Sequence, residues 1–202
     1  MSATDVVIIA SGGANIASLR FAFERLNVAA AVSADAARIR AASHVILPGV
    51  GAAADAMARL RHAGLDELIP TLRQPVLGIC LGMQLLFDSS AEGEAVCLGV
   101  IPGRAERLAD APGRPVPHIG WNTLAIVRPS PLLAGVSEDS YAYFVHSFAL
   151  PVGPATIATT RYGEPFSACV QRRNFFGAQF HPERSAAVGA QVLRNFLAVP
   201  CA

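Results

Sequence analysis

The stretch Pro75–Gln84, which reads Pro-Val-Leu-Gly-Ile-Cys-Leu-Gly-Met-Gln, most narrowly restricts the folds open to this chain. Its apolar run up to Ile79 predicts a buried strand, and the residues after Cys80 predict a helix that begins at once. Gly78 and Gly82 lie two residues on either side of Cys80, where small neighbours permit a sharp turn. This pattern predicts a nucleophile elbow with the thiol exposed at its tip.

The position of Cys80 also bears on its reactivity. A helix N-terminus carries unpaired N–H groups and partial positive charge, which favour the thiolate over the thiol. The alternative is a structural cysteine in an apolar run, because free cysteine is among the most buried residue types. Taken alone, this stretch leaves both interpretations open.

Composition excludes several classes of function. Hydrophobic residues make up 52% of the 202 residues and charged residues 15%, which predicts a packed globular chain. A formal net charge of +1 gives no reason to expect binding to nucleic acid or to a membrane surface. All 16 basic residues are arginine, so Schiff-base chemistry and a lysine-dependent phosphate loop are excluded.

The cysteines and the N-terminus indicate the compartment. No two of Cys80, Cys97, Cys169 and Cys201 have the C-x-x-C spacing, so we expect neither a metal site nor a cofactor. A free, reactive Cys80 requires a reducing compartment. The apolar run Val6–Ala10 is too short for a signal peptide or a membrane span, and we expect a cytoplasmic protein.

Strand and helix patterns alternate over the first ninety residues. This order predicts an α/β fold with a doubly wound, parallel sheet. The expected strands are 6–10, 28–32, 44–49 and 76–79, and the expected helices are 16–26, 52–61, 65–72 and a helix from Leu81 to about Phe87.

After Ala91 the pattern changes to closely spaced strands, which predicts antiparallel pairs that extend the parallel sheet. A helix over 186–197 closes the chain, with Ser185 as a suitable N-cap. No linker or repeat is visible, so we expect residues 1–202 to form one domain. The later strands are expected at 123–127, 141–148, 156–161, 166–171 and 175–180.

The segment His181-Pro-Glu183 is the second group of polar residues suited to take part in a reaction. In an extended segment, residues two apart point to the same side, and Pro182 favours extended geometry in the residue before it. Glu183 can then hold the ring of His181 while that ring faces a sulfur, which is the logic of a catalytic triad. The alternative is a polar strand end that caps the last helix.

Pro48-Gly-Val-Gly51 follows a buried strand, and its glycines let backbone N–H groups turn toward a ligand. Acyl transfer needs such donors where the oxyanion forms. The N–H of Leu81 and one from Val50 or Gly51 are the candidates. The alternative is a plain strand-to-helix turn.

Together, the Gly78–Gln84 elbow, the Pro-Gly-Val-Gly loop and the Phe180-His-Pro-Glu183 segment resemble the class I, or triad, glutamine amidotransferases. Two further stretches, Pro117–Asn122 and Tyr143–Phe148, are similar to the glutaminase subunits of imidazole glycerol phosphate synthase. The resemblance covers nearly the whole chain. It implies a flavodoxin-like core with a mostly parallel sheet, extended by antiparallel strands and covered by helices on both faces.

The resemblance also implies a mechanism. The Cys80 thiolate attacks the side-chain amide of glutamine, and His181, oriented by Glu183, protonates the departing ammonia and then activates water. The residues implied to bind glutamine are Gln84, Gly51, His146, Ser147 and Phe148.

The partner implied by the resemblance is a (β/α)8-barrel cyclase subunit, bound as a heterodimer. It receives the ammonia and converts the nucleotide PRFAR to imidazole glycerol phosphate and AICAR in histidine biosynthesis. Asn15, Trp121 and Arg184 match interface positions. Two departures concern this interface: the turn Ala10–Asn15 keeps only Asn15 and part of the family's glycine pattern, and Arg184 replaces the usual lysine.

Three alternatives remain at this point. The chain could be the glutaminase of another pathway, such as anthranilate or aminodeoxychorismate synthesis. It could be a catalytically idle binding subunit with the same fold. It could also be a peptidase or γ-glutamyl hydrolase that needs no partner. Trp121 in its Pro-His-Ile-Gly-Trp-Asn setting argues against the first, and the intact set of Cys80, His181 and Glu183 argues against the second.

Overall fold

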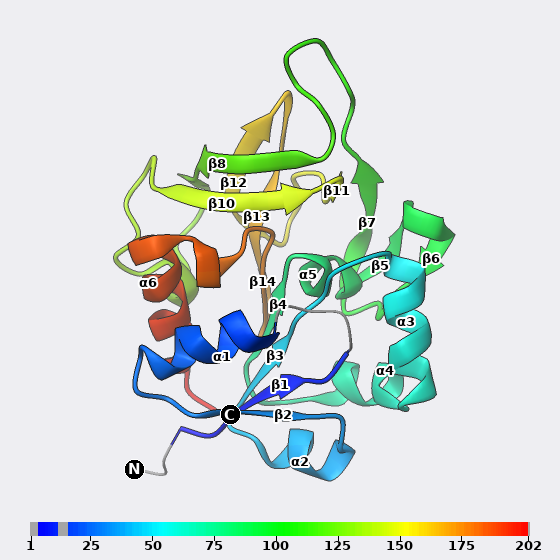
Figure 1. Ribbon diagram of the computed structural model, residues 1–202, viewed down its shortest axis with the longest axis vertical. Helices are drawn as coiled ribbons and strands as arrows, with labels where there is room; N and C mark the ends of the chain where they lie inside the picture. The colour runs from blue at the N-terminus through cyan, green and yellow to red at the C-terminus, as the bar shows by residue number, and fades with distance from the viewer. Residues whose placement is uncertain (1–3, 12–15, 202) are drawn as a thin grey trace.

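The structure, a computed structural model, describes residues 4–11 and 16–201 and is organised around an eight-stranded sheet (Figure 1). The strand order is β2-β1-β3-β4-β14-β13-β12-β9. The first five strands run parallel: β2 (Ala30–Ser33), β1 (Val6–Ile9), β3 (His44–Leu47), β4 (Val76–Ile79) and β14 (Phe175–Ala178). The last three are antiparallel: β13 (Glu164–Arg172), β12 (Thr156–Tyr162) and β9 (Ala125–Ile126). The predicted fold class is confirmed.

Helices cover both faces of this sheet, which explains why its parallel strands are apolar without alternation. In β1, Val6 and Ile8 pack into one core and Val7 and Ile9 into the other. The first core includes side chains of α1 (Ile16–Glu24) and α6 (Ala186–Leu197). The second includes side chains of α2 (Ala36–Ala41), α3 (Ala53–His62) and α4 (Leu65–Leu68), which continues into the 3-10 turn η1 (Ile69–Thr71).

Two smaller sheets lie beyond the carboxyl end of β4 and complete the fold (Figure 1). One has the order β11-β7-β5-β6, and the other pairs β10 with β8. Their strands are β5 (Phe87–Ser90), β6 (Ala95–Val96), β7 (Ile101–Arg107), β11 (Phe148–Ala149), β8 (His118–Thr123) and β10 (Tyr141–His146). The remaining 3-10 turns are η2 (Glu92–Glu94), η3 (Pro131–Leu133) and η4 (Pro182–Arg184).

Several predicted boundaries were wrong. The helix after Cys80, α5, ends at Leu85, because Phe87–Ser90 pairs with the distant strand β7. Helix α2 was not predicted, although Asp35 is a clear N-cap whose carboxylate accepts the Arg38 N–H at 2.6 Å. The second strand begins at Ala30, two residues late, and the strand expected at 123–127 is divided between β8 and β9.

Ser185 precedes α6 as predicted, but its hydroxyl does not cap the helix. The hydroxyl instead donates to the carbonyl of His181 at 2.7 Å and accepts the N–H of Tyr143 at 2.9 Å. It therefore ties the His181 segment to β10, which is a role in positioning the site.

The single domain expected over 1–202 stays a prediction. It is supported by the central sheet, in which β14 from the end of the chain lies directly against β4. Within residues 4–11 and 16–201, no helix combines the length and the apolar character needed to cross a membrane.

The elbow depends on Gly82, and we expect Gly82→Ala to destabilise the protein severely. A Cβ atom there would lie far inside van der Waals contact with the Leu47 carbonyl oxygen, which is backbone and cannot move aside cheaply. We expect a loss of about 3 kcal/mol in the free energy of unfolding and a fall of about 6–12 °C in Tm. Thermal unfolding measures this. The matched control is Gly153→Ala, because its Cβ would meet no atom within 4 Å. Equal Tm values for both variants would contradict the requirement for a bare Gly82.

Candidate active site

Cys80 lies at the tip of the turn between β4 and α5 (Leu81–Leu85), with φ +52° and ψ −114°. A residue with a side chain rarely adopts this conformation, which is a strained geometry found at nucleophile elbows. The backbone N–H of Cys80 donates to the carbonyl of Ala178 at 2.8 Å, which fixes the elbow against β14. Cys80 is buried, with 7% of the residue exposed, so the prediction of a thiol exposed at the tip was wrong.

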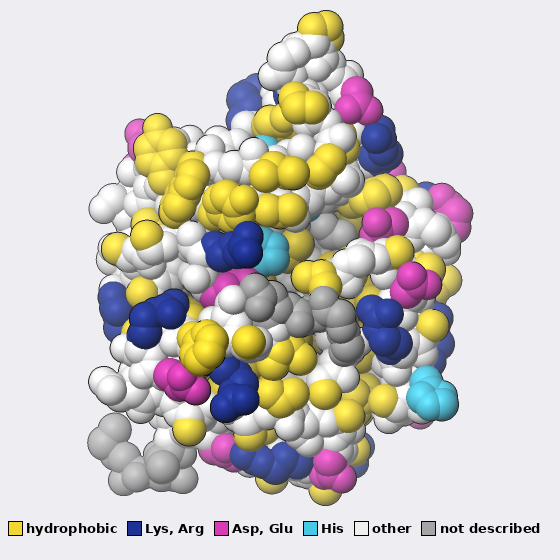
Figure 2. Space-filling model, in the orientation of Figure 1, with side chains coloured by type: hydrophobic (Ala, Val, Ile, Leu, Met, Phe, Trp, Pro, Cys, Tyr) yellow, Lys and Arg dark blue, Asp and Glu magenta, His cyan; other side chains and the backbone are white. Residues whose placement is uncertain are grey.

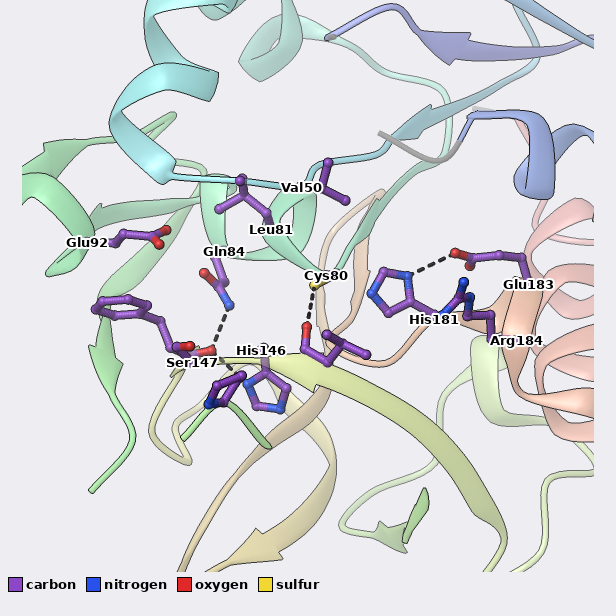
Figure 3. A pocket seen from close by; sticks show the side chains of 14 residues that line it. Val50, Cys80, Leu81, Gln84, Glu92, His146, Ser147, His181, Glu183 and Arg184 are labelled. Atoms are coloured by element: carbon purple, nitrogen blue, oxygen red, sulfur yellow. Dashed lines mark hydrogen bonds and ion pairs between the residues drawn. The ribbon is translucent and has the colours of Figure 1, made fainter. Parts of the chain in front are cut away.

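His181 and Glu183 follow β14; the ring of His181 lies beside Cys80, and Glu183 lies on the far side of that ring (Figure 3). The Nδ1 atom of His181 is 2.9 Å from Oε1 of Glu183, which leaves Nε2 for the sulfur side. The prediction that an extended segment would align these side chains was wrong. Pro182–Arg184 forms the 3-10 turn η4, and this turn folds the carboxylate back onto the ring.

The environment of His181 favours its charged form. Burial alone would lower the pKa of the imidazole, but hydrogen bonds with Cys80 and Glu183, and the negative charges on those groups, raise it to about 10. A protonated ring beside the sulfur stabilises a thiolate. The three side chains can therefore supply a nucleophile, a proton donor and acceptor, and a group that orients the ring.

We expect Glu183→Gln to lower the pKa of His181, because the variant loses a negative charge held 2.9 Å from the ring. The raised pKa stabilises the fold at pH values below the unfolded histidine's value of about 6.5, and this contribution is lost as the pH rises through about 10. In the variant it should be lost at lower pH. NMR titration of the His181 ring and urea unfolding between pH 6 and 10 measure both effects. The control is Glu24→Gln on the exposed face of α1, and an unchanged His181 titration in Glu183→Gln would refute the pairing.

A cavity of about 440 Å³ opens in front of the sulfur. It brings together most of the residues expected at the site, but Trp121 does not line it, and Asn15 lies outside the described residues. The lining residues are Val50, Gly51, Cys80, Leu81, Gln84, Glu92, Pro117, Val145, His146, Ser147, Phe148, His181, Glu183 and Arg184.

Val50, Gly51 and Leu81 form the wall where oxyanion donors are expected. Leu81 is the first residue of α5, where helical N–H groups have no internal acceptor. Gly51 has φ +85°, a conformation that favours glycine, and its position leaves open space around the loop. This wall can present backbone N–H groups to a ligand.

Gln84 forms another wall of the cavity, and the nitrogen of its side-chain amide makes two hydrogen bonds. Nε2 donates to the carbonyl of Phe148 at 2.8 Å and to Oε1 of Gln179 at 2.9 Å. Because both amide protons are used, the amide oxygen of Gln84 remains for a donor in the pocket.

Glu92 is a pocket residue that sequence analysis missed. Its Oε2 accepts the N–H of Ala53 at 2.9 Å at the start of α3, and its carboxyl group points toward Gln84 (Figure 3). Burial raises the pKa of Glu92, while the Ala53 N–H opposes that rise. An acid in a polar loop gives no distinguishing signal, because only the tertiary fold brings residue 92 to the site.

His146 lines the pocket but is not a second acid or base near neutral pH. Burial lowers its pKa to about 3, and its Nδ1 lies 2.8 Å from the carbonyl oxygen of Phe148. The neutral ring therefore donates Nδ1–H to that carbonyl. His146 therefore supports the pocket wall by holding the backbone of Phe148.

An exposed apolar surface on β8 and β10 adjoins the site, and we name it the β8–β10 face (Figure 2). It is formed by Ile119, Trp121 and Tyr141, which are 60%, 52% and 60% exposed. Trp121 packs edge-on against Tyr143, and the guanidinium of Arg184 lies 5.8 Å from the centre of the Tyr143 ring. Trp121 and Arg184 are thus joined through Tyr143 at the mouth of the pocket.

Metal ligation finds no support in the part of the chain that the structure describes. No group of three or more His, Cys, Asp or Glu side chains there could hold an ion, and all four cysteines are free.

Comparison with known proteins points to one family. Residues 9–199 match the family described as glutamine amidotransferase class-I. Imidazole glycerol phosphate synthase subunit HisH of Xylella fastidiosa (strain Temecula1 / ATCC 700964) is 53% identical over 98% of this chain and 100% of its own. The protein of the same name from Xanthomonas euvesicatoria pv. vesicatoria (strain 85-10) is 55% identical over 96% of this chain and 97% of its own.

Two solved structures share the fold at low sequence identity. One is a glutamine amidotransferase with a TM-score of 0.73 and 19% identity, matched over 95% of this chain and 96% of its own. The other is a glutamine amidotransferase from Thermotoga maritima with a TM-score of 0.64 and 19% identity, matched over 98% of this chain and 82% of its own.

Proposed function

The chain belongs to the class-I glutamine amidotransferases, and within them to the HisH subunits of imidazole glycerol phosphate synthase, and we propose that it hydrolyses glutamine to glutamate and ammonia. The ammonia is delivered to a HisF-like cyclase subunit. One observation carries the glutaminase proposal: a strained cysteine and the ring of His181 line the same cavity side by side, and Glu183 holds that ring at 2.9 Å (Figure 3).

The proposed reaction has two halves. The Cys80 thiolate attacks the side-chain amide carbon of glutamine, and the carbonyl oxygen becomes an oxyanion that the N–H groups near Val50, Gly51 and Leu81 stabilise. His181 gives its proton to the departing nitrogen, so ammonia leaves and a γ-glutamyl thioester remains. His181 then takes a proton from water, which attacks the thioester and releases glutamate and the thiol.

The charges around the pocket support glutamine as the substrate. The α-ammonium group requires acceptors, and the free amide oxygen of Gln84 and the carboxylate of Glu92 face the same cavity. The backbone at His146, Ser147 and Phe148 lines the side where the α-carboxylate and α-carbon are expected. Gly51 keeps the opposite side open.

We propose that the partner is a (β/α)8-barrel cyclase that forms a heterodimer with this chain and converts PRFAR to imidazole glycerol phosphate and AICAR. The β8–β10 face supports this, because exposed aromatic side chains with an arginine beside them are typical of interfaces. We place Trp121, Arg184 and Asn15 at this interface. A free, reactive thiol supports a cytoplasmic location.

The oxyanion loop is the proposed point of control. In this proposal the peptide near Val50 turns its N–H into the pocket when the partner binds its nucleotide. The positive φ of Gly51 supports such a turn, since glycine adopts both signs of φ readily.

The decisive experiment measures glutamate release by the purified chain alone, with the cyclase subunit, and with the cyclase subunit and its nucleotide. We expect release to be strongly stimulated in the last case. Stimulation only by an anthranilate or aminodeoxychorismate synthase would assign the chain to another pathway. Release of glutamate from γ-glutamyl peptides without a partner would indicate a hydrolase, and no release in any mixture would indicate an idle subunit.

A further inference from the structure

Gln179 is a fully buried polar residue that contacts the nucleophile. Its Nε2 lies 3.8 Å from Sγ of Cys80, and its Oε1 accepts from Gln84 at 2.9 Å. A buried amide destabilises the fold unless its hydrogen bonds are made. The amide of Gln179 lies between β14 and the elbow, and it makes its hydrogen bonds with two residues of the pocket, Cys80 and Gln84.

The carbonyl of Phe148 determines the direction of these bonds. A carbonyl oxygen can only accept, so the atom of Gln84 that faces it must be the amide nitrogen. The second proton of that nitrogen then points to Gln179, which must present its oxygen. The nitrogen of Gln179 is consequently left facing the sulfur of Cys80.

A neutral histidine, His146, also bonds the Phe148 carbonyl, and a second neutral histidine, His118, bonds His146 in turn. His146 donates Nδ1–H to Phe148, so its Nε2 must accept, and Nδ1 of His118 lies 3.2 Å away as the donor. Burial lowers the pKa of His118 to about 4 and that of His146 to about 3, so both rings remain uncharged near neutral pH. The acceptor that orients Gln84 and Gln179 is therefore itself fixed.

The sulfur needs donors once it ionises. As a thiol, Cys80 donates to the carbonyl of Val145 at 3.6 Å, and this contact has no attraction for a thiolate. The donors then within reach are the ring of His181 and the amide of Gln179. A hydrogen bond to a charged acceptor is about twice as strong as one between neutral groups.

We propose that Gln179 serves the glutaminase reaction in two ways: its N–H stabilises the Cys80 thiolate, and its oxygen keeps the Gln84 oxygen turned toward the α-ammonium group of glutamine. The first is a direct contact with the reacting atom, and the second is a positioning role. The second rests on the function proposed above, whereas the first can be tested without substrate.

The test of the sulfur contact uses two variants and iodoacetamide. Gln179→Met removes the donor and the acceptor at similar volume, and Gln179→Glu keeps an acceptor for Gln84 but loses the amide donor. We expect both variants to slow the alkylation of Cys80 about tenfold at pH 8, because each loses one charge-assisted hydrogen bond to the thiolate. Peptide mass spectrometry locates the label, and exposed Cys201 in the same samples should react at an unchanged rate.

The test of the positioning role compares KM with kcat for glutamine in the complex with the cyclase subunit. Gln179→Met should raise KM about tenfold, because Gln84 loses one of its two anchors, and should also lower kcat. Gln179→Glu should keep KM within about threefold, because its carboxylate still accepts from Gln84, while kcat falls. A residue that served only packing would not separate the two constants in this way.

Two controls keep the proposal falsifiable. Gln171→Met removes a glutamine side chain of β13 that bonds Ser130 and does not line the cavity, and it should leave alkylation and kinetics unchanged. Gln84→Met should raise KM. The proposal is overturned if folded Gln179 variants alkylate at the wild-type rate, or if Gln171→Met slows alkylation equally. Absence of wild-type glutaminase activity would overturn the proposed function, while the alkylation rates would still decide the sulfur contact.

Discussion

Cys80→Ser is expected to abolish glutamine-dependent synthesis by the complex while synthesis from added ammonium salts survives. Serine has nearly the same shape, so the pocket and the surface offered to the partner should be kept. Its hydroxyl ionises far less readily than a thiol, so the ring of His181 cannot maintain a charged nucleophile there. We expect glutamine-dependent activity to fall by at least about 10³-fold. The measurement is formation of the cyclase product with glutamine or with ammonium chloride as the nitrogen source.

Cys97→Ser is the matched control for this experiment. Burial raises the pKa of Cys97 to about 11, although Arg61 opposes this, so its thiol stays protonated and unreactive. Its substitution should leave both activities close to wild type. Loss of synthesis from both nitrogen sources in Cys80→Ser would instead assign that side chain a structural role.

His181→Asn is expected to have the second largest effect, because one ring serves both halves of the reaction. Without it the leaving nitrogen receives no proton, the thioester has no base to activate water, and the thiolate loses its charged partner. We expect glutamate release to fall about 10²–10⁴-fold. Ammonium-dependent synthesis should persist, which separates the chemical defect from a failure to assemble. Steady-state glutamate release in the presence of the cyclase subunit measures the effect.

The control for His181→Asn is His62→Asn, at the exposed end of α3 and outside the pocket. It should retain wild-type kinetics. If His181→Asn kept more than about a tenth of the wild-type rate, the assignment of this ring as the acid and base would be wrong.

Local sequence patterns predicted the parts of the fold that depend on local physics. The apolar run before Cys80, with glycines on both sides of it, indicated β4 and the elbow, and the structure has both. The helix 186–197 was predicted at the bounds it has. In these segments, burial on both faces and steric limits near the backbone leave few alternatives.

Segments that depend on distant partners were predicted poorly. Phe87–Ser90 has no apolar alternation and is a strand because β7 and β6 pair with it on its two sides. The approach of Glu183 to His181 depends on the 3-10 turn η4, which hydrogen bonds from β10 and Ser185 help to hold. No pattern of one residue type would reveal such a contact.

The candidate site also contains residues that a local pattern predicts and residues that depend on distant partners. The candidates at the elbow, the Pro-Gly-Val-Gly loop and the His-Pro-Glu segment all line the cavity, because each follows the carboxyl end of a neighbouring strand. Glu92 carries no signal of this kind, and Gln179 follows β14 directly but does not line the cavity. Glu92 reaches the cavity from a loop beyond β5, and Gln179 is recognised only by the atoms its buried amide contacts.

Covalent labelling by a diazo-ketone analogue of glutamine tests most directly whether Cys80, His181 and Glu183 act together on one amide carbon. With the cyclase subunit and its nucleotide present, the account predicts one label per chain, located on Cys80, prevented by excess glutamine and greatly slowed in His181→Asn. No label on Cys80 under those conditions, or a label on another cysteine that glutamine does not prevent, would contradict it.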